Sequence, residues 1–137
     1  MTGAVAATTE RVTGIRTRIA ALPAAVAGNA MLSRRGRHLN TTCLLEIGDD
    51  AFRLRIVEGQ IAEARQGPFT TPSAEFVISG PAAIWRRFLA AEPPPGDHDL
   101  LAFVKRHELR LAGNLHPLMS HLLYFKALLA CLVEGAR

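Results

Sequence analysis

Ser120 and His121 are the residues whose types most suggest nucleophilic catalysis, because a histidine can accept the proton of a serine hydroxyl. Adjacent side chains on a helix point in different directions, however, so we expect these two not to share a proton directly. His116 precedes His121 by five residues, whereas two helical histidines that bind one metal ion are four apart. The segment therefore predicts neither a nucleophile–base pair nor a metal site.

The other titratable groups suggest no reaction either. Asp97-His98-Asp99 is typical of a helix cap, with Asp97 as the capping residue, more than of a metal site. Cys43 and Cys131 lie far apart in the sequence, which favours reduced thiols in a cytoplasmic protein over a disulfide framework. The chain has no glycine-rich phosphate loop and no Cys-x-x-Cys motif. We therefore predict a protein that is not an enzyme and needs no cofactor or metal.

Composition favours one globular domain over residues 1–137, since 49% of the residues are apolar and no long polar tract interrupts them. The net charge of +4 comes from arginine, because Lys105 and Lys126 are the only lysines. The arginines are scattered without interleaved aromatic residues, which argues against nucleic-acid binding. A basic loop over residues 33–38 could contact a membrane surface or an acidic partner, or could simply be solvated; its charges are Arg34, Arg35 and Arg37.

A short strand that leads into an aromatic helix is the element around which the rest is arranged. Residues 74–79 alternate as a strand, with Phe76 and Ile78 on one face. Gly80-Pro81 ends the strand, and Pro81 suits the first helical position. The helix then places four large apolar side chains on one face and two arginines opposite: Ile84, Trp85, Phe88 and Leu89 against Arg86 and Arg87. Burying the four apolar side chains stabilises the fold by roughly 6–12 kcal/mol.

The segments before this strand predict helices and then a meander. Residues 8–32 form an N-terminal helical segment capped by Thr9 and ended or kinked at Pro23, with apolar positions Val12, Ile15, Ile19 and Leu22. Strands follow over residues 39–47, 52–57 and 60–65, joined by tight turns at residues 48–50 and 58–59. The third strand alternates poorly, which favours an edge position or a bulge.

The segments after the strand over residues 74–79 predict helices that pack on the sheet, with one more strand between them. Residues 93–95 form a stiff proline linker. A helix capped by Asp97 follows, with Lys105-Arg106 in its last turn, and residues 109–111 form a last strand. One long apolar helix then runs from Leu115 to Val133. Lys126 would cost about 2.5–3.5 kcal/mol inside a bilayer, so we expect a helix buried on one side rather than a membrane span.

Three short stretches together resemble the sterol carrier protein type-two family of lipid-binding domains. They are Ile56–Ile61, Glu75–Ser79 with the following Ile84-Trp85, and Leu109–Asn114 before the leucine-rich helix. The resemblance covers residues 39–132. It implies an α+β fold, with a five-stranded antiparallel sheet, helices packed on one face and an apolar tunnel between them. The ligands implied are fatty acyl chains, acyl-CoA, sterols or isoprenoid lipids, bound without chemistry.

The same resemblance assigns the tunnel walls, although these side chains could equally be plain core: Trp85, Phe88, Leu89, Phe103, Leu118, Leu122 and Phe125. The proline linker departs from the family at the expected tunnel mouth. The last residues, Gly135-Ala136-Arg137, are not a peroxisomal address, which favours a bacterial cytoplasmic member and argues against a sterol ligand.

Three functions follow as hypotheses. The first is a lipid-binding or carrier protein. The second is an accessory protein that presents a hydrophobic intermediate to an enzyme complex, for example in quinone biosynthesis. The third is a structural module whose core is filled and whose last helix forms a homodimer.

Overall fold

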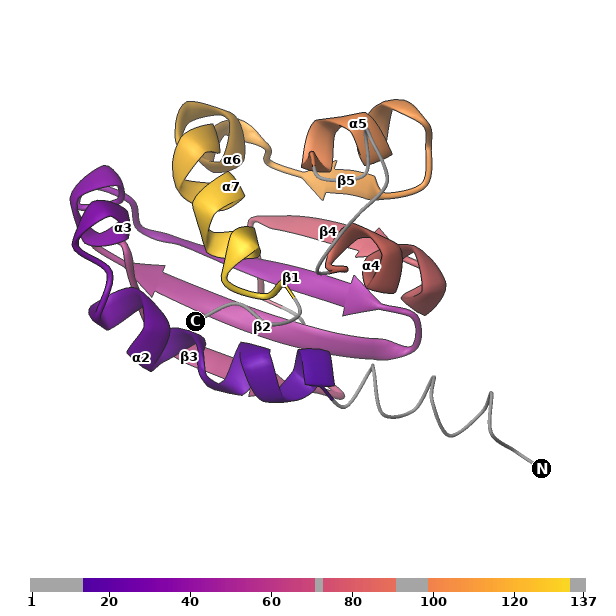
Figure 1. The fold of residues 1–137 in the computed structure, drawn as a ribbon, viewed down its shortest axis with the longest axis horizontal. Helices are drawn as coiled ribbons and strands as arrows, with labels where there is room; N and C mark the ends of the chain where they lie inside the picture. The colour runs from indigo at the N-terminus through magenta and orange to yellow at the C-terminus, as the bar shows by residue number, and fades with distance from the viewer. Residues whose placement is uncertain (1–13, 71–72, 91–98, 134–137) are drawn as a thin grey trace.

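A five-stranded sheet carries the helices on one face in the computed structural model, which describes residues 14–70, 73–90 and 99–133 (Figure 1). The strand order is β3-β2-β1-β4-β5. The strands are β1 Thr41–Ile47, β2 Asp50–Val57, β3 Gln60–Gln66, β4 Phe76–Gly80 and β5 Arg110–Gly113. The helices include α2 Leu22–Ala27, α3 Ala30–Arg35, α4 Ala82–Phe88, α5 Leu100–Lys105, α6 His116–Ser120 and α7 Leu122–Ala130. This arrangement confirms the expected α+β class.

The sheet is mixed, which corrects the expectation of a purely antiparallel sheet. β1, β2 and β3 form the predicted antiparallel meander. β4 then pairs with the free edge of β1 and runs parallel to it, with Cys43 opposite Phe76 and Ile47 opposite Gly80. The chain must therefore cross from the β3 edge to the far side of β1 after residue 66, and a crossover of this kind is what a parallel pair requires.

The strands bury one face in the predicted register. Alternate positions of β1, β2 and β4 are at most 2% exposed, and they are Cys43, Leu45, Ile47, Phe52, Leu54, Ile56, Phe76 and Ile78. β3 lies at the edge of the sheet and its pairing with β2 shifts between Arg55 and Ile56. Both the edge position and the bulge predicted for the third strand are confirmed.

The N-terminal helices follow the sequence pattern with one correction. A helix over residues 14–20 buries Ile15 and Ile19, and α2 begins with Pro23 in its first turn. Thr9 and Val12 lie outside the described residues. Residues 33–35 are helical rather than loop, because the Asn29 side chain accepts a hydrogen bond from the Leu32 backbone N–H at 3.1 Å and so caps α3.

The cap of α5 also differs from the sequence prediction. Asp99, not Asp97, precedes this helix, and its carboxylate accepts a hydrogen bond from the Leu101 backbone N–H at 3.2 Å. Asp97 and the predicted linker over residues 93–95 lie outside the described residues. Pro81 takes the N-cap position of α4 rather than the first helical position.

The predicted last helix is two helices, α6 and α7, because the backbone leaves the helical conformation at His121 (φ −126°, ψ 40°). After this break, α7 packs on the sheet, and the Tyr124 hydroxyl donates a hydrogen bond to the Gly59 carbonyl at 2.6 Å. No helix in the described part of the chain is long and apolar enough to cross a membrane.

The outer face of the sheet is less open than its alternation predicts. Arg55 is exposed, but Arg53 pairs with Glu63 at 3.2 Å and its guanidinium lies 4.9 Å from the centre of the Phe69 ring. Leu44, the exception in the alternation of β1, is also buried on this face and lines the same hollow as Phe69. The segment that follows β3 therefore covers part of the outer face.

This difference predicts unequal effects for the two arginines. Arg55→Ser should change the free energy of unfolding by less than about 0.5 kcal/mol, whereas Arg53→Ser should cost about 1 kcal/mol because it removes an ion pair and a cation–π contact. Phe52→Ala should cost about 3–5 kcal/mol, since its ring is in the core. Urea unfolding measures all three, and an Arg55→Ser loss as large as that of Phe52→Ala would refute the register.

Candidate ligand-binding core

The predicted tunnel-wall residues come together in one apolar core. Six of the seven are at most 6% exposed, and they are Trp85, Phe88, Leu89, Phe103, Leu118 and Phe125. Leu122 is half-buried and packs against the same core. Their contact with a ligand stays a prediction.

The first group of these residues forms a row of aromatic rings from α4 to α5. The Trp85 indole N–H donates a hydrogen bond to the Glu46 carbonyl of β1 at 2.9 Å, which fixes α4 on the sheet. The ring of Phe88 lies 6.1 Å from that of Trp85 and 5.1 Å from that of Phe103, both with edge-to-face geometry. The row therefore links β1 to α5 through the core.

The second group comes from α6 and α7. The Phe125 ring meets Phe76 of β4 at 5.4 Å and Tyr124 at 5.3 Å, again edge to face. Lys126 pairs with Asp99 at 3.4 Å, which joins α7 to the beginning of α5. Two helical pairs, α4–α5 and α6–α7, therefore contribute to one apolar core on the same sheet.

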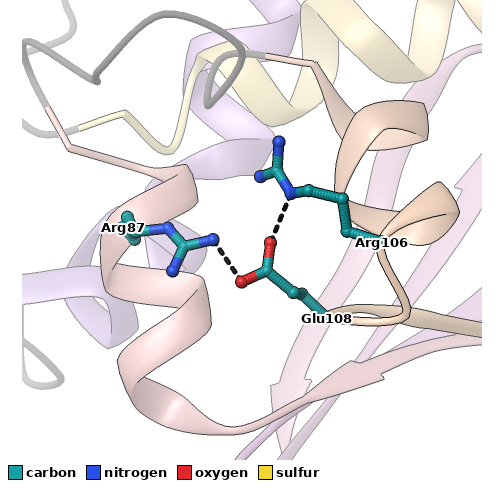
Figure 2. A network of polar contacts seen from close by, with 3 residues as sticks. All are labelled: Arg87, Arg106 and Glu108. Carbon is teal, nitrogen blue, oxygen red and sulfur yellow. Dashed lines mark hydrogen bonds and ion pairs between the residues drawn. The ribbon is translucent and has the colours of Figure 1, made fainter.

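Arg87, Arg106 and Glu108 form an ion-pair cluster that the sequence did not predict (Figure 2). The cluster lies over Phe103. The Glu108 carboxylate bonds Arg87 of α4 with one oxygen and the Arg106 Nε with the other, the latter at 2.6 Å. Both guanidinium groups lie over the Phe103 ring, at 5.2 Å and 4.6 Å from its centre. The helical pattern predicted that Arg87 lies on a solvated face. Arg87 is instead half-buried against the core. In the sequence, Glu108 alternates with Leu109, and this pattern alone does not indicate which arginines the carboxylate would meet.

Glu108 should make stability depend on pH. The hydrogen bonds from Arg87 and Arg106 lower the pKa of Glu108 below its usual 4.5. A carboxyl with a depressed folded-state pKa contributes stability above its unfolded pKa, and this stability is lost as the pH falls through the folded value. The melting temperature of Glu108→Gln should therefore be lower at neutral pH and decline less below pH 4.5 than that of the wild type.

The exposed Glu58, whose side chain forms no ion pair within the described residues, is the matched control for this measurement. Glu58→Gln should leave the acid limb of the melting curve as in the wild type. Identical pH profiles for the wild type and Glu108→Gln would contradict the role of the cluster.

The remaining titratable groups that the structure describes form no catalytic arrangement. Burial raises the pKa of Cys43 to about 12 and also raises the pKa of Cys131, so both free thiols are protonated at neutral pH. Contrary to the sequence expectation, Ser120 Oγ does lie 3.1 Å from His121 Nδ1, because the helix breaks between them. The same hydroxyl donates to the His116 carbonyl at 2.8 Å, which directs its proton away from the histidine. No metal-binding group of three ligands exists within residues 14–70, 73–90 and 99–133.

Comparisons with known proteins identify the fold. The chain superposes on a crystal structure of sterol carrier protein 2 with a TM-score of 0.71 and 18% identity, over 88% of this chain and 96% of the other. A conserved hypothetical protein of Thermus thermophilus, described as possibly a sterol carrier protein, gives a TM-score of 0.65 and 16% identity, over 88% and 90%. A UbiJ-SCP2 ubiquinone synthesis protein gives 0.56 and 15% identity, over 90% and 98%.

No protein-family model matches the sequence, and neither does any curated protein. At these identities the structural likeness establishes the fold. The chain has the sterol carrier protein 2 fold over nearly its whole described length, so the family resemblance indicated by the sequence is confirmed at the level of architecture.

Proposed function

We propose that this protein binds or transfers a hydrophobic ligand between its sheet and its helices and catalyses no reaction. The ligand class is a fatty acyl, acyl-CoA, isoprenoid or sterol-like lipid. The observation that carries the proposal is the apolar core built from two helical pairs. We assign Trp85, Phe88, Leu89 and Phe103 to one wall of the ligand site, and Leu118, Leu122 and Phe125 to the other. The sterol carrier protein 2 fold supports it.

Energetics exclude a large cavity that stays empty. A lipid site takes up about 300 Å³ or more. Left empty, a cavity of that size would cost roughly 7 kcal/mol, against the about 5–15 kcal/mol of net stability that a small domain has. A fold of this kind should therefore hold a ligand, admit water or close around a filled core.

A second candidate function is presentation of a hydrophobic intermediate to a biosynthetic enzyme complex. The likeness to a ubiquinone synthesis protein supports this alternative. It differs from simple carriage because it needs a protein partner, which affinity capture from the native cell would recover. The third candidate is a structural module whose core is filled and whose last helix forms a homodimer. The exposed Leu123 on α7 is compatible with this candidate. A bacterial origin and a cytoplasmic location stay predictions.

The direct experiment is mass spectrometry of the natively expressed protein, sprayed under non-denaturing conditions and again after organic extraction. The proposal predicts an adduct of lipid mass that disappears on extraction and that is identified in the extract. Protein that carries no adduct, and an extract without lipid above that of a control protein, would favour the filled-core module.

A further inference from the structure

The helices α3 and α7 meet at one end of the molecule (Figure 1). The helices α3, α6 and α7 each leave one large apolar side chain in solvent. Leu123 is 64% exposed, Met119 47% and Met31 42%. Among the large apolar side chains of the described residues, only Val57 is otherwise exposed to this degree. Met119 and Leu123 line one hollow, and exposed apolar side chains that lie together mark an interaction surface.

The break at His121 creates this surface. A hollow of about 350 Å³ opens there between α3 and the α6–α7 junction, lined by Arg35, Met119, Ser120, His121, Leu122, Leu123 and Tyr124. Leu122 and Tyr124 also pack into the core, so the hollow adjoins the proposed ligand site. A continuous helix would have turned these side chains to other faces.

The charge around the hollow has one sign. Residues 22–45 and 114–133, which include α3, α6 and α7, contain no aspartate or glutamate. Arg34, Arg35 and Arg37 are exposed, and none of the ion pairs among the described residues uses them. Glu58, in the turn that approaches Gly36, is the acidic residue that adjoins this end. The basic side chains therefore border an apolar tip with no acid lining the hollow.

From this arrangement we propose that the surface formed by Met31, Met119, Leu123 and the three arginines docks on an anionic lipid bilayer. The arginines bind the acidic head groups, while the apolar side chains enter the boundary between head groups and acyl chains. Neither charge nor an apolar tip alone holds a protein on a membrane durably, but the two together do. The proposal rests on the proposed function, since the docked hollow would be where a lipid passes between the bilayer and the core.

Co-sedimentation with vesicles tests this surface. The full chain should bind phosphatidylcholine vesicles that contain about one third phosphatidylglycerol much better than pure phosphatidylcholine vesicles, and raised salt should weaken the binding. Replacing Arg34, Arg35 and Arg37 by serine should reduce the affinity by about fivefold for each arginine, hence about a hundredfold. The matched control replaces three exposed arginines elsewhere, Arg55, Arg65 and Arg110, and should leave binding within about threefold of the wild type.

A fluorescent variant tests the apolar tip independently. In a Trp85→Phe background, Leu123→Trp places the only tryptophan at the tip, and its emission should shift to the blue on addition of the anionic vesicles. Unchanged emission, or equal loss of binding in both arginine triples, would overturn the proposal. So would a stable dimer in sedimentation velocity that Leu123→Ser converts to monomer, because the surface would then be a subunit interface.

Failure of this proposal can be told apart from failure of the proposed function. Met119→Ser with Leu123→Ser should lose vesicle binding at least tenfold and still take up a fatty acid added from solution, read by Trp85 emission. A wild-type protein that binds vesicles but takes up no fatty acid would leave the docking surface in place and remove the ligand site.

Discussion

Gly59→Ala is expected to destabilise the protein by at least about 3 kcal/mol, although it adds only one methyl group. Gly59 has a φ of +78°, and a Cβ atom there would lie 2.6 Å from the carbonyl carbon and oxygen of Gly36. Gly36 in turn packs on Tyr124, whose hydroxyl donates to the Gly59 carbonyl at 2.6 Å. The substitution should therefore separate the β2–β3 turn from α3 and remove the support of α7. Urea unfolding followed by circular dichroism measures the loss.

Gly28→Ala is the matched control, because Gly28 ends α2 with an ordinary φ of −85°. The nearest atom to its added Cβ would be the Ala24 carbonyl oxygen at 3.5 Å. This variant should be neutral or more stable by about 0.4–1 kcal/mol, since alanine restricts the unfolded chain. Equal stability of Gly59→Ala and Gly28→Ala would show that the close contact between the turn and α3 does not exist.

Trp85→Ala is expected to cost about 3–5 kcal/mol, the second large effect. Trp85 is fully buried, contacts Phe88, and supplies the indole N–H whose hydrogen bond the Glu46 carbonyl accepts. Trp85→Phe keeps a ring in place and removes this N–H, so it should cost about 1–2 kcal/mol. Circular dichroism is the suitable probe, because both variants lack the tryptophan.

Leu123→Ala controls for the loss of an apolar side chain at an exposed position and should change stability by less than about 0.5 kcal/mol. The account of α4 would be wrong if Trp85→Ala were no more costly than Leu123→Ala. If Trp85→Phe were as costly as Trp85→Ala, the expectation that any buried ring suffices at this position would be wrong. The fit of the indole ring would then matter more than burial of a ring.

Local patterns predicted the parts of the fold that depend on neighbouring residues. The alternation in β2 and the strand–helix pair around Trp85 were predictable because periods of two and 3.6 are properties of a single element. The turn glycines Gly48 and Gly59, with φ of +63° and +78°, were predictable for the same reason. The order of these elements was enough to indicate the fold that the structural comparisons confirm.

Contacts between distant segments could not be predicted in this way. The parallel pairing of β1 with β4 depends on a crossover whose path no local pattern encodes. Arg87 appeared solvated because its helix alone places it opposite Trp85, and only α5 and β5 bring Glu108 to it. The break at His121 was missed because the apolar positions continue through it, so hydrophobicity alone predicted one helix.

Trp85 emission from delipidated protein, titrated with a long-chain fatty acid or an isoprenoid, tests the central claim most directly. Trp85 is the only tryptophan and lies in the proposed ligand-binding core, so it reports on that site alone. We predict a saturable shift of the Trp85 emission with one ligand per chain. The melting temperature should also rise, because ligand at about 100 times its Kd adds about 2.7 kcal/mol to the free energy of unfolding. Emission that does not change, together with a melting temperature that stays flat over the same titration, would contradict the claim that this core binds lipid.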